Sequence, residues 1–169
     1  MSIIRNEGQE GNMWRQVRAG ALAFALAVSA VAVSAYAADG AAGALVTVAS
    51  SKSFEQVSDA VKSLVAKNGM MVMAQVDQGK MLSMTGLSLK ATVFLIGNPT
   101  VGKQLFEQNH AVGLYVPLRI AVYTDTDGKT YVQYDKPSAL LEQFKNEKIG
   151  MVAHMLDEKI GGLATMAAQ

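Results

Sequence analysis

The sequence predicts an α+β domain with a mainly antiparallel sheet and helices on its faces, and three observations lead to this class. Short apolar or alternating segments, typical of strands, are separated by segments with apolar residues at helical spacing. The last two strand-like segments are joined by a short turn containing Asp-Gly, which makes them antiparallel neighbours. The order does not repeat strictly as strand and helix, which favours α+β. We expect the order β-α-β-(α)-β-α-β-β-α.

The first elements have clear start and stop signals. Residues 44–50 alternate as a strand, and Ser53 then opens a helix because Ser53 and Gln56 have the spacing of a capping box. Apolar residues recur at helical intervals until Asn68 and Gly69 stop the run. We therefore expect one strand and one well-defined helix before residue 70.

The remaining elements follow from periodicity and turn residues. We expect a strand at 70–77, a short helical segment at 78–86, an inner strand at 91–97, a helix at 99–109, and a hairpin formed by 116–125 and 129–135. A last helical region follows, which we expect Ser138 to cap. Glycines at 150, 161 and 162 predict that this region is broken into pieces.

Residues 1–37 have the features of a secretory signal peptide. Arginines precede Ala19–Ser34, an uncharged, alanine-rich run shorter than the ~20 strongly apolar residues of a spanning helix. A small-x-small motif predicts cleavage between Ala37 and Ala38, which implies a periplasmic or secreted protein without stable membrane insertion. Met13 is an alternative translation start, and an uncleaved N-terminal membrane anchor is the alternative interpretation.

The composition excludes several classes of function. After residue 37 the chain has twelve basic and twelve acidic residues, so no net charge attracts nucleic acid. Cysteine is absent, which excludes disulfides, thiol catalysis and thiolate metal sites. Half of the residues are apolar, so a core can form by packing alone.

The stretch "LIGNPTVGKQ" at 95–104 resembles a phosphate-binding loop but fits a helix start better. Such a loop needs Ser or Thr after its lysine, and Gln104 stands there instead. Asn98 is a preferred N-cap, Pro99 suits the first helical position, and Gly97 allows a sharp turn. We predict a corner between a strand and a helix, without nucleotide.

Several motifs together resemble the family known as domain of unknown function 302. They are the segment from Phe54 to Gly69, Gly97-Asn98-Pro99, Val116-Pro117-Leu118-Arg119, Asp127-Gly128, and Tyr134 with Pro137. The resemblance covers residues 50–141, so 38–49 form a flexible stub and first strand and 142–169 a C-terminal helical extension. It implies a compact α+β domain that can pair into homodimers, and it supplies no catalytic residues.

Methionine is unusually frequent, with ten residues, of which five lie close together: Met70, Met71, Met73, Met81 and Met84. Because alternate strand residues point to opposite faces, Met71 and Met73 could share a site that Met70 could not. Thioethers are soft ligands that suit Cu(I), but methionine also fills apolar cores. We favour core packing here.

A second group combines Met151, His154 and Met155, of which Met151 and His154 lie three residues apart and hence on one helix face. Thioether and imidazole are ligands for copper or haem iron, so the group is a candidate metal site. The rival interpretation, which we favour, is that these methionines pack in the core.

The two histidines and two acidic residues are weaker candidates. His110 and His154 lack a nucleophile nearby in the sequence, although Asp157 could orient His154. Asp125 and Asp127 begin like a calcium loop, but Tyr134 stands where its bidentate glutamate belongs, which favours a solvated hairpin tip.

Arg119 is a charge within an apolar strand. Alternation places it on the face opposite Ile120 and Val122. If that face is concave, Arg119 could bind an anion together with the helix start at Asn98. The alternative, which we favour, is an ion pair at an edge or interface.

These observations favour an exported, non-catalytic binding or accessory protein that forms a homodimer and holds no cofactor. Small-molecule or anionic ligands are the expected partners, with Asn98 and Arg119 as candidate contacts. A periplasmic copper or haem binder is the first alternative. A small hydrolase or isomerase with an unrecognised site is the second.

Overall fold

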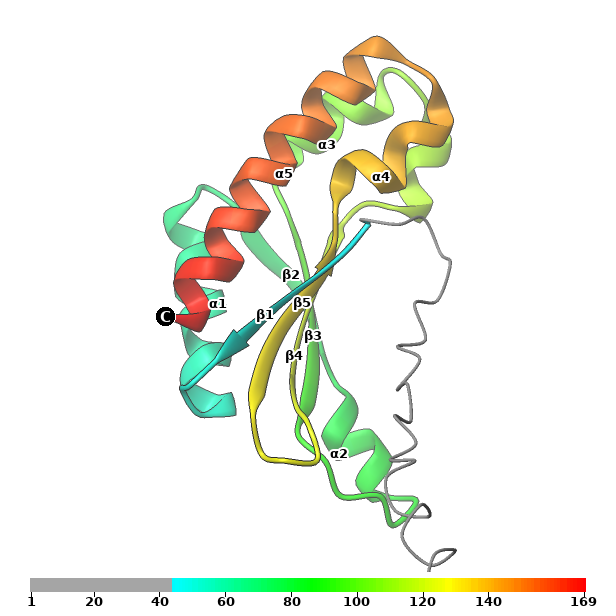
Figure 1. The fold of residues 1–169 in the computed structure, drawn as a ribbon. Helices are drawn as coiled ribbons and strands as arrows, with labels where there is room; N and C mark the ends of the chain where they lie inside the picture. Colours follow the sequence, from blue (N-terminus) through cyan, green and yellow to red (C-terminus); the bar gives the residue numbers. More distant parts are fainter. Residues whose placement is uncertain (1–43) are drawn as a thin grey trace, which may run out of the picture. The chain divides into compact units, whose positions relative to one another are not determined.

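A computed structural model of the protein describes residues 44–169 (Figure 1). The predicted leader, its cleavage site at Ala37 and Ala38, and the alternative start at Met13 lie outside the described residues. The strands are β1 (Leu45–Ser50), β2 (Met71–Asp77), β3 (Ala91–Gly97), β4 (Leu118–Thr124) and β5 (Thr130–Asp135). The helices are α1 (Phe54–Lys67), α2 (Gln78–Ser83), α3 (Pro99–Phe106), α4 (Pro137–Leu141), α5 (Glu147–Ala168) and the 3₁₀ turns η1 (His110–Leu114) and η2 (Glu142–Phe144).

The strands form one five-stranded sheet in the order β1-β5-β4-β3-β2. Each neighbouring pair is antiparallel, so the predicted α+β class with an antiparallel sheet is confirmed. Strand β1 pairs with β5 instead of with a strand close in sequence, which places the start of the described chain at one edge of the sheet. The helix η1 was not anticipated from the sequence.

Helix α1 begins with the predicted capping box. The Ser53 hydroxyl accepts the amide of Gln56 at 3.2 Å, and the Gln56 side chain accepts the amide of Ser53 at 3.0 Å. Val57, Val61 and Val65 lie four residues apart, and all three are fully buried. This spacing gives the helix one apolar stripe, which packs on the sheet.

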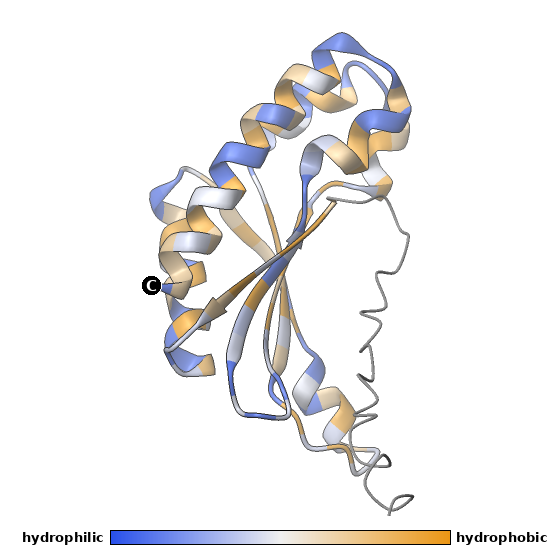
Figure 2. Ribbon diagram, in the orientation of Figure 1, coloured by the Kyte–Doolittle hydropathy of each residue, from blue (hydrophilic) through white to orange (hydrophobic). Residues whose placement is uncertain are grey.

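Helices α1 and α5 lie on the same side of the sheet (Figure 1), and the core lies between them and the strands. The sheet contributes alternate residues of its inner strands, and α5 contributes a long apolar stripe. The fully buried side chains of these elements include Phe94, Ile96, Ile120, Val122, Val132, Ile149, Ile160 and Leu163. Figure 2 shows hydrophilic residues of α5 interspersed with the apolar ones, as expected for a helix with one buried face.

The last helical region differs from the sequence prediction. Ser138 does not cap it, because α4 begins one residue earlier at Pro137 and its N-cap, Lys136, makes no side-chain hydrogen bond. Instead Asp157 of α5 accepts the amide of Ser138 at 2.9 Å. A carboxylate from the neighbouring helix therefore satisfies an amide at the start of α4.

Helix α5 runs through its glycines for 22 residues, so the predicted breaks at 150, 161 and 162 are wrong. A glycine inside a helix costs about 1 kcal/mol relative to alanine. The buried stripe of α5 outweighs this cost. Gly161 has a further role, since a Cβ at this position would lie 3.2 Å from the Tyr134 hydroxyl oxygen.

Strand β2 contains a β-bulge at Met73. Its register against β3 shifts between Val72 and Ala74. An extra residue in one strand interrupts the alternation of side chains between the two faces. Predictions from alternation therefore fail at this point of β2.

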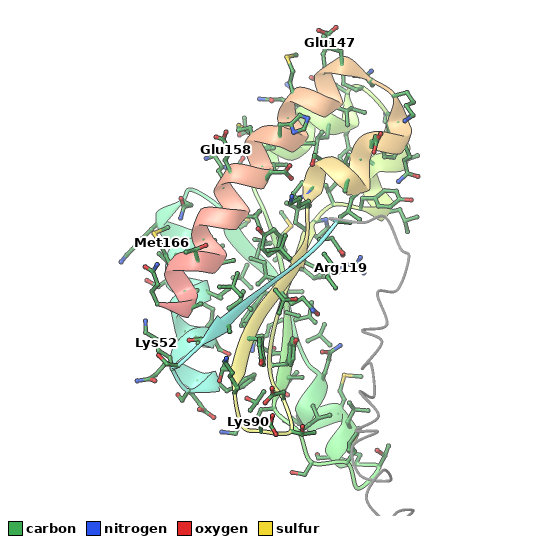
Figure 3. The ribbon with its side chains drawn as sticks, in the orientation of Figure 1. Lys52, Lys90, Arg119, Glu147, Glu158 and Met166 are labelled. Carbon is green, nitrogen blue, oxygen red and sulfur yellow. The ribbon has the colours of Figure 1, made fainter. Side chains whose placement is uncertain are left out.

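The face of the sheet away from α1 and α5 is only partly buried, and we call it the open face. Its apolar residues, assigned from register and burial, are Val76, Val93, Leu95, Ala121, Tyr123 and Tyr131. The rings of Tyr123 and Tyr131 stack there with centroids 5.4 Å apart. Arg119 lies on this side too (Figure 3), with a guanidinium nitrogen 3.9 Å from an Asp135 carboxylate oxygen.

Candidate functional site

An apolar pocket of about 370 Å³ lies at the corner between β3 and α3. We call it the corner pocket. Its walls come from β2, the corner itself, α3, the segment that leads into β4, and α5. It is lined by Asn68, Met70, Met73, Ile96, Gly97, Asn98, Pro99, Val101, Gly102, Lys103, Leu105, Phe106, Val116, Pro117, Leu118, Leu156 and Lys159.

Asn98 holds the corner together through both ends of its side-chain amide. Its nitrogen donates to the carbonyl oxygen of Gly69 at 2.6 Å, and its oxygen accepts the amides of Thr100 at 2.8 Å and Val101 at 3.1 Å. Asn98 is thus the N-cap of α3 and ties that helix to the turn after α1.

The same geometry decides the nature of the stretch at 95–104. A single residue, Asn98, separates the end of β3 at Gly97 from the start of α3 at Pro99. A phosphate-binding loop needs several free amides around the phosphate, whereas here the side chain of Asn98 already occupies two of them. The corner is a helix start, as the sequence predicted.

Arg119 and Asn98 do not belong to one site. Arg119 is opposite Leu95 in the pairing of β4 with β3, and its side chain lies on the open face beside Asp135. Asn98 lines the corner pocket, and Arg119 does not. Asn98 and Arg119 therefore do not form the joint anion site that the sequence suggested.

The first methionine group does not pack in the core as we favoured, because only Met70 is buried and Met71, Met73, Met81 and Met84 are exposed. Met70 and Met73 line the corner pocket, whereas Met71 does not. The bulge at Met73 breaks the alternation on which the prediction rested. The thioether of Met73 also lies against Gly97, since a Cβ there would be 2.9 Å from the Met73 methyl carbon.

The polar part of the pocket is small and positively charged. Its charged lining residues are Lys103 of α3 and Lys159 of α5. The Lys103 ammonium is 3.6 Å from a Glu107 carboxylate oxygen, and both side chains are exposed, so this pair is weak. None of the salt bridges within residues 44–169 involves Lys159.

Met151, His154 and Met155 share the outer surface of α5, away from the corner pocket. Their exposures are 61% for Met151 and 38% for Met155, and the His154 side chain is 77% exposed. In the described part of the chain, no three His, Asp or Glu residues gather closely enough to hold a metal ion. Met151 and Met155 therefore do not pack in the core as we favoured, and all three side chains are exposed to solvent on α5.

The histidines have no catalytic arrangement among residues 44–169. The His154 ring nitrogen Nδ1 is 3.7 Å from one Asp157 oxygen, beyond hydrogen-bond length, while the other oxygen accepts the Ser138 amide. His154 and Ser138 line the same shallow polar hollow, but no hydrogen bond joins the Ser138 hydroxyl to His154. His110 lies exposed in η1.

The tip of the β4–β5 hairpin is held by Asp125. One of its carboxylate oxygens accepts the amides of Asp127 at 3.0 Å and Lys129 at 2.9 Å. The hydrogen bond from the Lys129 amide is the main reason that the pKa of Asp125 is lowered. Tyr134 is buried in the core, so a calcium loop does not form around it.

Comparison with protein families identifies the fold. Residues 46–166 match the family described as domain of unknown function DUF302. The chain belongs to this family. The match includes α5, whereas the sequence motifs placed the shared region at 50–141 and treated residues 142–169 as an extension.

A solved member of the DUF302 family has the same fold. The crystal structure of an uncharacterized conserved DUF302 protein from Bacillus stearothermophilus aligns with a TM-score of 0.68 and 18% sequence identity. The alignment covers 74% of this chain and 98% of that chain.

Curated relatives of this DUF302 protein include proteins named as ion channels. The chain is 32% identical over 100 residues to the fluoride-specific ion channel FluC 1 of Brucella suis and to FluC 2 of Brucella melitensis. The match covers 59% of this chain but 39% and 37% of those relatives. Within residues 44–169, no helix is both long and apolar enough to cross a membrane.

Proposed function

We propose that this DUF302 protein is a non-catalytic binding protein that takes a small, largely apolar ligand in the corner pocket. The observation that carries the proposal is the pocket itself, with its predominantly apolar lining around a rigid corner. Its volume of about 370 Å³ is at the small end of the ~300–1,000 Å³ typical of ligand pockets.

The lining also favours binding over catalysis. The corner pocket contains no His, Asp or Glu that could serve as a general acid or base. Its Asn98 amide is engaged in capping α3 and contacting Gly69, so it serves to fix the corner. The pocket therefore offers a preformed apolar surface and few groups for chemistry.

Filling the pocket tests the proposal. Gly102 lines the pocket within α3, and a Cβ at Gly102 meets nothing within 4 Å. A side chain at Gly102 therefore meets no steric obstacle, and because Gly102 lines the pocket, the leucine of Gly102→Leu is expected to take up part of its volume. The neutral dye N-phenyl-1-naphthylamine is expected to bind the wild-type protein with saturable fluorescence and to lose at least about tenfold in affinity in this variant, since ~1.4 kcal/mol of apolar contact suffices.

Gly162→Leu is the matched control. Gly162 also lies in a helix, and a Cβ there meets nothing within 4 Å, but Gly162 does not line the pocket. Both variants replace a helical glycine by a better helix former, so neither is expected to melt at a lower temperature than the wild type. Equal dye binding by the wild type and Gly102→Leu, or no saturable binding to the wild type, contradicts the proposal.

The proposed binding protein is exported, with its leader removed after Ala37. Support comes from the basic start, the short alanine-rich run and the small-x-small motif of residues 1–37. We expect the full chain, expressed in a bacterium with a periplasm, to yield periplasmic protein whose mass corresponds to a start at Ala38. Protein that stays in the membrane fraction at its full mass would favour the anchor instead.

The proposed protein acts as a homodimer that pairs through the open face. Five strands spaced by ~4.8 Å, each rising ~3.3 Å per residue over about six residues, give a plane of roughly 24 Å by 20 Å. Side chains enlarge this area toward the ~800 Å² per partner that a stable interface buries. The strands carry one charge of each sign here, Arg119 and Asp135, so a two-fold axis would pair unlike charges twice.

The curated relatives support an accessory role. They are named fluoride-specific ion channels, and this chain spans less than two-fifths of their length. The matched region is therefore one part of those proteins. Fluoride itself does not suit the corner pocket, because a small, strongly hydrated anion would lose its water to a mainly apolar lining.

A further inference from the structure

We infer that the ligand of the corner pocket is a small amphiphilic anion, with an apolar body inside the pocket and one carboxylate, sulfonate or phosphate group beside Lys103 and Lys159. This inference rests on the proposed binding function and adds the chemical class of the ligand. It draws on the charge of the lining, which the proposed function does not use.

The charges of the pocket all have the same sign. Lys103 from α3 and Lys159 from α5 line it, and no acidic side chain does. Glu107, which is 3.6 Å from the Lys103 ammonium, lies outside the lining and forms only a weak, exposed pair with it. The positive charge is specific to the pocket, because residues 38–169 as a whole carry equal numbers of basic and acidic residues. Two helices thus bring cations to an otherwise apolar concavity, which is complementary to an amphiphile with a negative group.

The other polar side chains of the lining are already hydrogen-bonded, which leaves the lysines as the contacts for an anion. The Asn68 side-chain nitrogen donates to the carbonyl oxygen of Leu64 at 2.8 Å. The Asn98 oxygen already accepts the amides of Thr100 and Val101, so the start of α3 offers the ligand no free amides from these residues. The Gly102 amide donates within the helix to the Asn98 carbonyl at 2.8 Å. A neutral ligand would leave both lysines without any role in binding, and a cationic one would be repelled.

Two dyes that share a ring system separate charge from apolar fit. 8-Anilino-1-naphthalenesulfonate carries a sulfonate, and N-phenyl-1-naphthylamine lacks it. The variants Lys103→Gln and Lys159→Gln remove one cation each and keep a polar side chain. We expect each variant to weaken binding of the sulfonate dye roughly two- to fivefold, as for a partly exposed ion pair, and to leave binding of the neutral dye unchanged.

Salt gives an independent measurement on the wild-type protein. Raising the ionic strength screens the lysines, so the affinity for the sulfonate dye is expected to fall while that for the neutral dye is unchanged. Lys148→Gln is the matched control, since Lys148 is exposed on α5 outside the pocket. The pocket-filling variant Gly102→Leu is expected to abolish the site for both dyes.

The outcomes distinguish this inference from the proposed function. If Gly102→Leu blocks the neutral dye but the lysine variants affect both dyes equally or not at all, the pocket binds ligands and the anionic class is wrong. If Lys148→Gln weakens the sulfonate dye as much as Lys159→Gln does, the lysines act only as general surface charge and the inference also fails. If neither dye responds to Gly102→Leu, the proposed function fails as well.

Discussion

At the scale of single residues, Gly161 and Gly162 are neighbours in α5 with different surroundings. A Cβ at Gly161 would be 3.2 Å from the Tyr134 hydroxyl oxygen, whereas one at Gly162 would meet nothing within 4 Å. Tyr134 is buried, and this burial is the main reason that its pKa is raised, followed by the charge of Asp157. The neutral tyrosine therefore fills the space that a side chain at Gly161 would need.

These surroundings predict opposite effects of the same substitution. Gly162→Ala is expected to stabilise the protein by about 1 kcal/mol through helix propensity. Gly161→Ala gains the same propensity, but its Cβ would lie 3.2 Å from the Tyr134 hydroxyl oxygen, so the buried Tyr134 must shift. Overpacking of this kind costs about 1–3 kcal/mol, so Gly161→Ala is expected to be less stable than Gly162→Ala by about that amount. Urea unfolding measures both free energies.

Removing the Tyr134 hydroxyl tests whether contact with it causes the difference in stability between Gly161→Ala and Gly162→Ala. Tyr134→Phe is expected to restore stability in the Gly161→Ala background more than it changes the wild type, because the crowded oxygen is gone. Equal stabilities of Gly161→Ala and Gly162→Ala would show that the Tyr134 contact is not responsible.

At the scale of elements, the sequence predicts those whose signals are local. The capping box at Ser53, the Asn98-Pro99 helix start and the Asp-Gly turn each act within a few residues, and all appear in the structure. Helix α5 was predicted in pieces because its continuity depends on packing against the sheet and α1, which local propensity does not describe.

The corner pocket likewise combines residues with a local sequence signal and residues that only the fold brings together. Asn98 could be selected from its cap signal, but the two lysines come from helices far apart in the sequence, so no local pattern joins them. Met70 and Met73 both line the pocket because of the bulge in β2. No glycine or proline at the bulge indicates this register shift in the sequence. In the sequence, Lys103 stands out only as the lysine of the stretch at 95–104 that resembles a phosphate-binding loop.

At the scale of the whole molecule, α1 and α5 cover one face of the sheet (Figure 1), and the open face carries half-exposed apolar side chains. The stacked tyrosines and Leu95 lie on this open face. Half-exposed apolar side chains on one face of a sheet favour association, because water gains freedom when two such faces meet.

A charge placed on the open face tests the proposed homodimer. Leu95→Lys is expected to convert a dimer into a monomer, because pairing would bury an ammonium group without a partner. Sedimentation equilibrium of the protein purified after expression of the full chain measures the mass.

Leu114→Lys is the matched control for this substitution. Leu114 is 83% exposed in η1, outside the open face, so this variant is expected to remain dimeric. A wild type that is monomeric over the whole concentration range, or a Leu95→Lys protein that stays dimeric, contradicts pairing through this face.

The position of α5 in the chain has a consequence for how the protein is made. Its apolar stripe closes the core against α1, β1 and β5, and the hydroxyl of Ser50 donates to the carbonyl oxygen of Ala168 at 2.6 Å. Because α5 follows the described strands in the sequence, a growing chain contains the whole sheet before it contains the helix that covers it. This core therefore stays incomplete until α5 has left the ribosome.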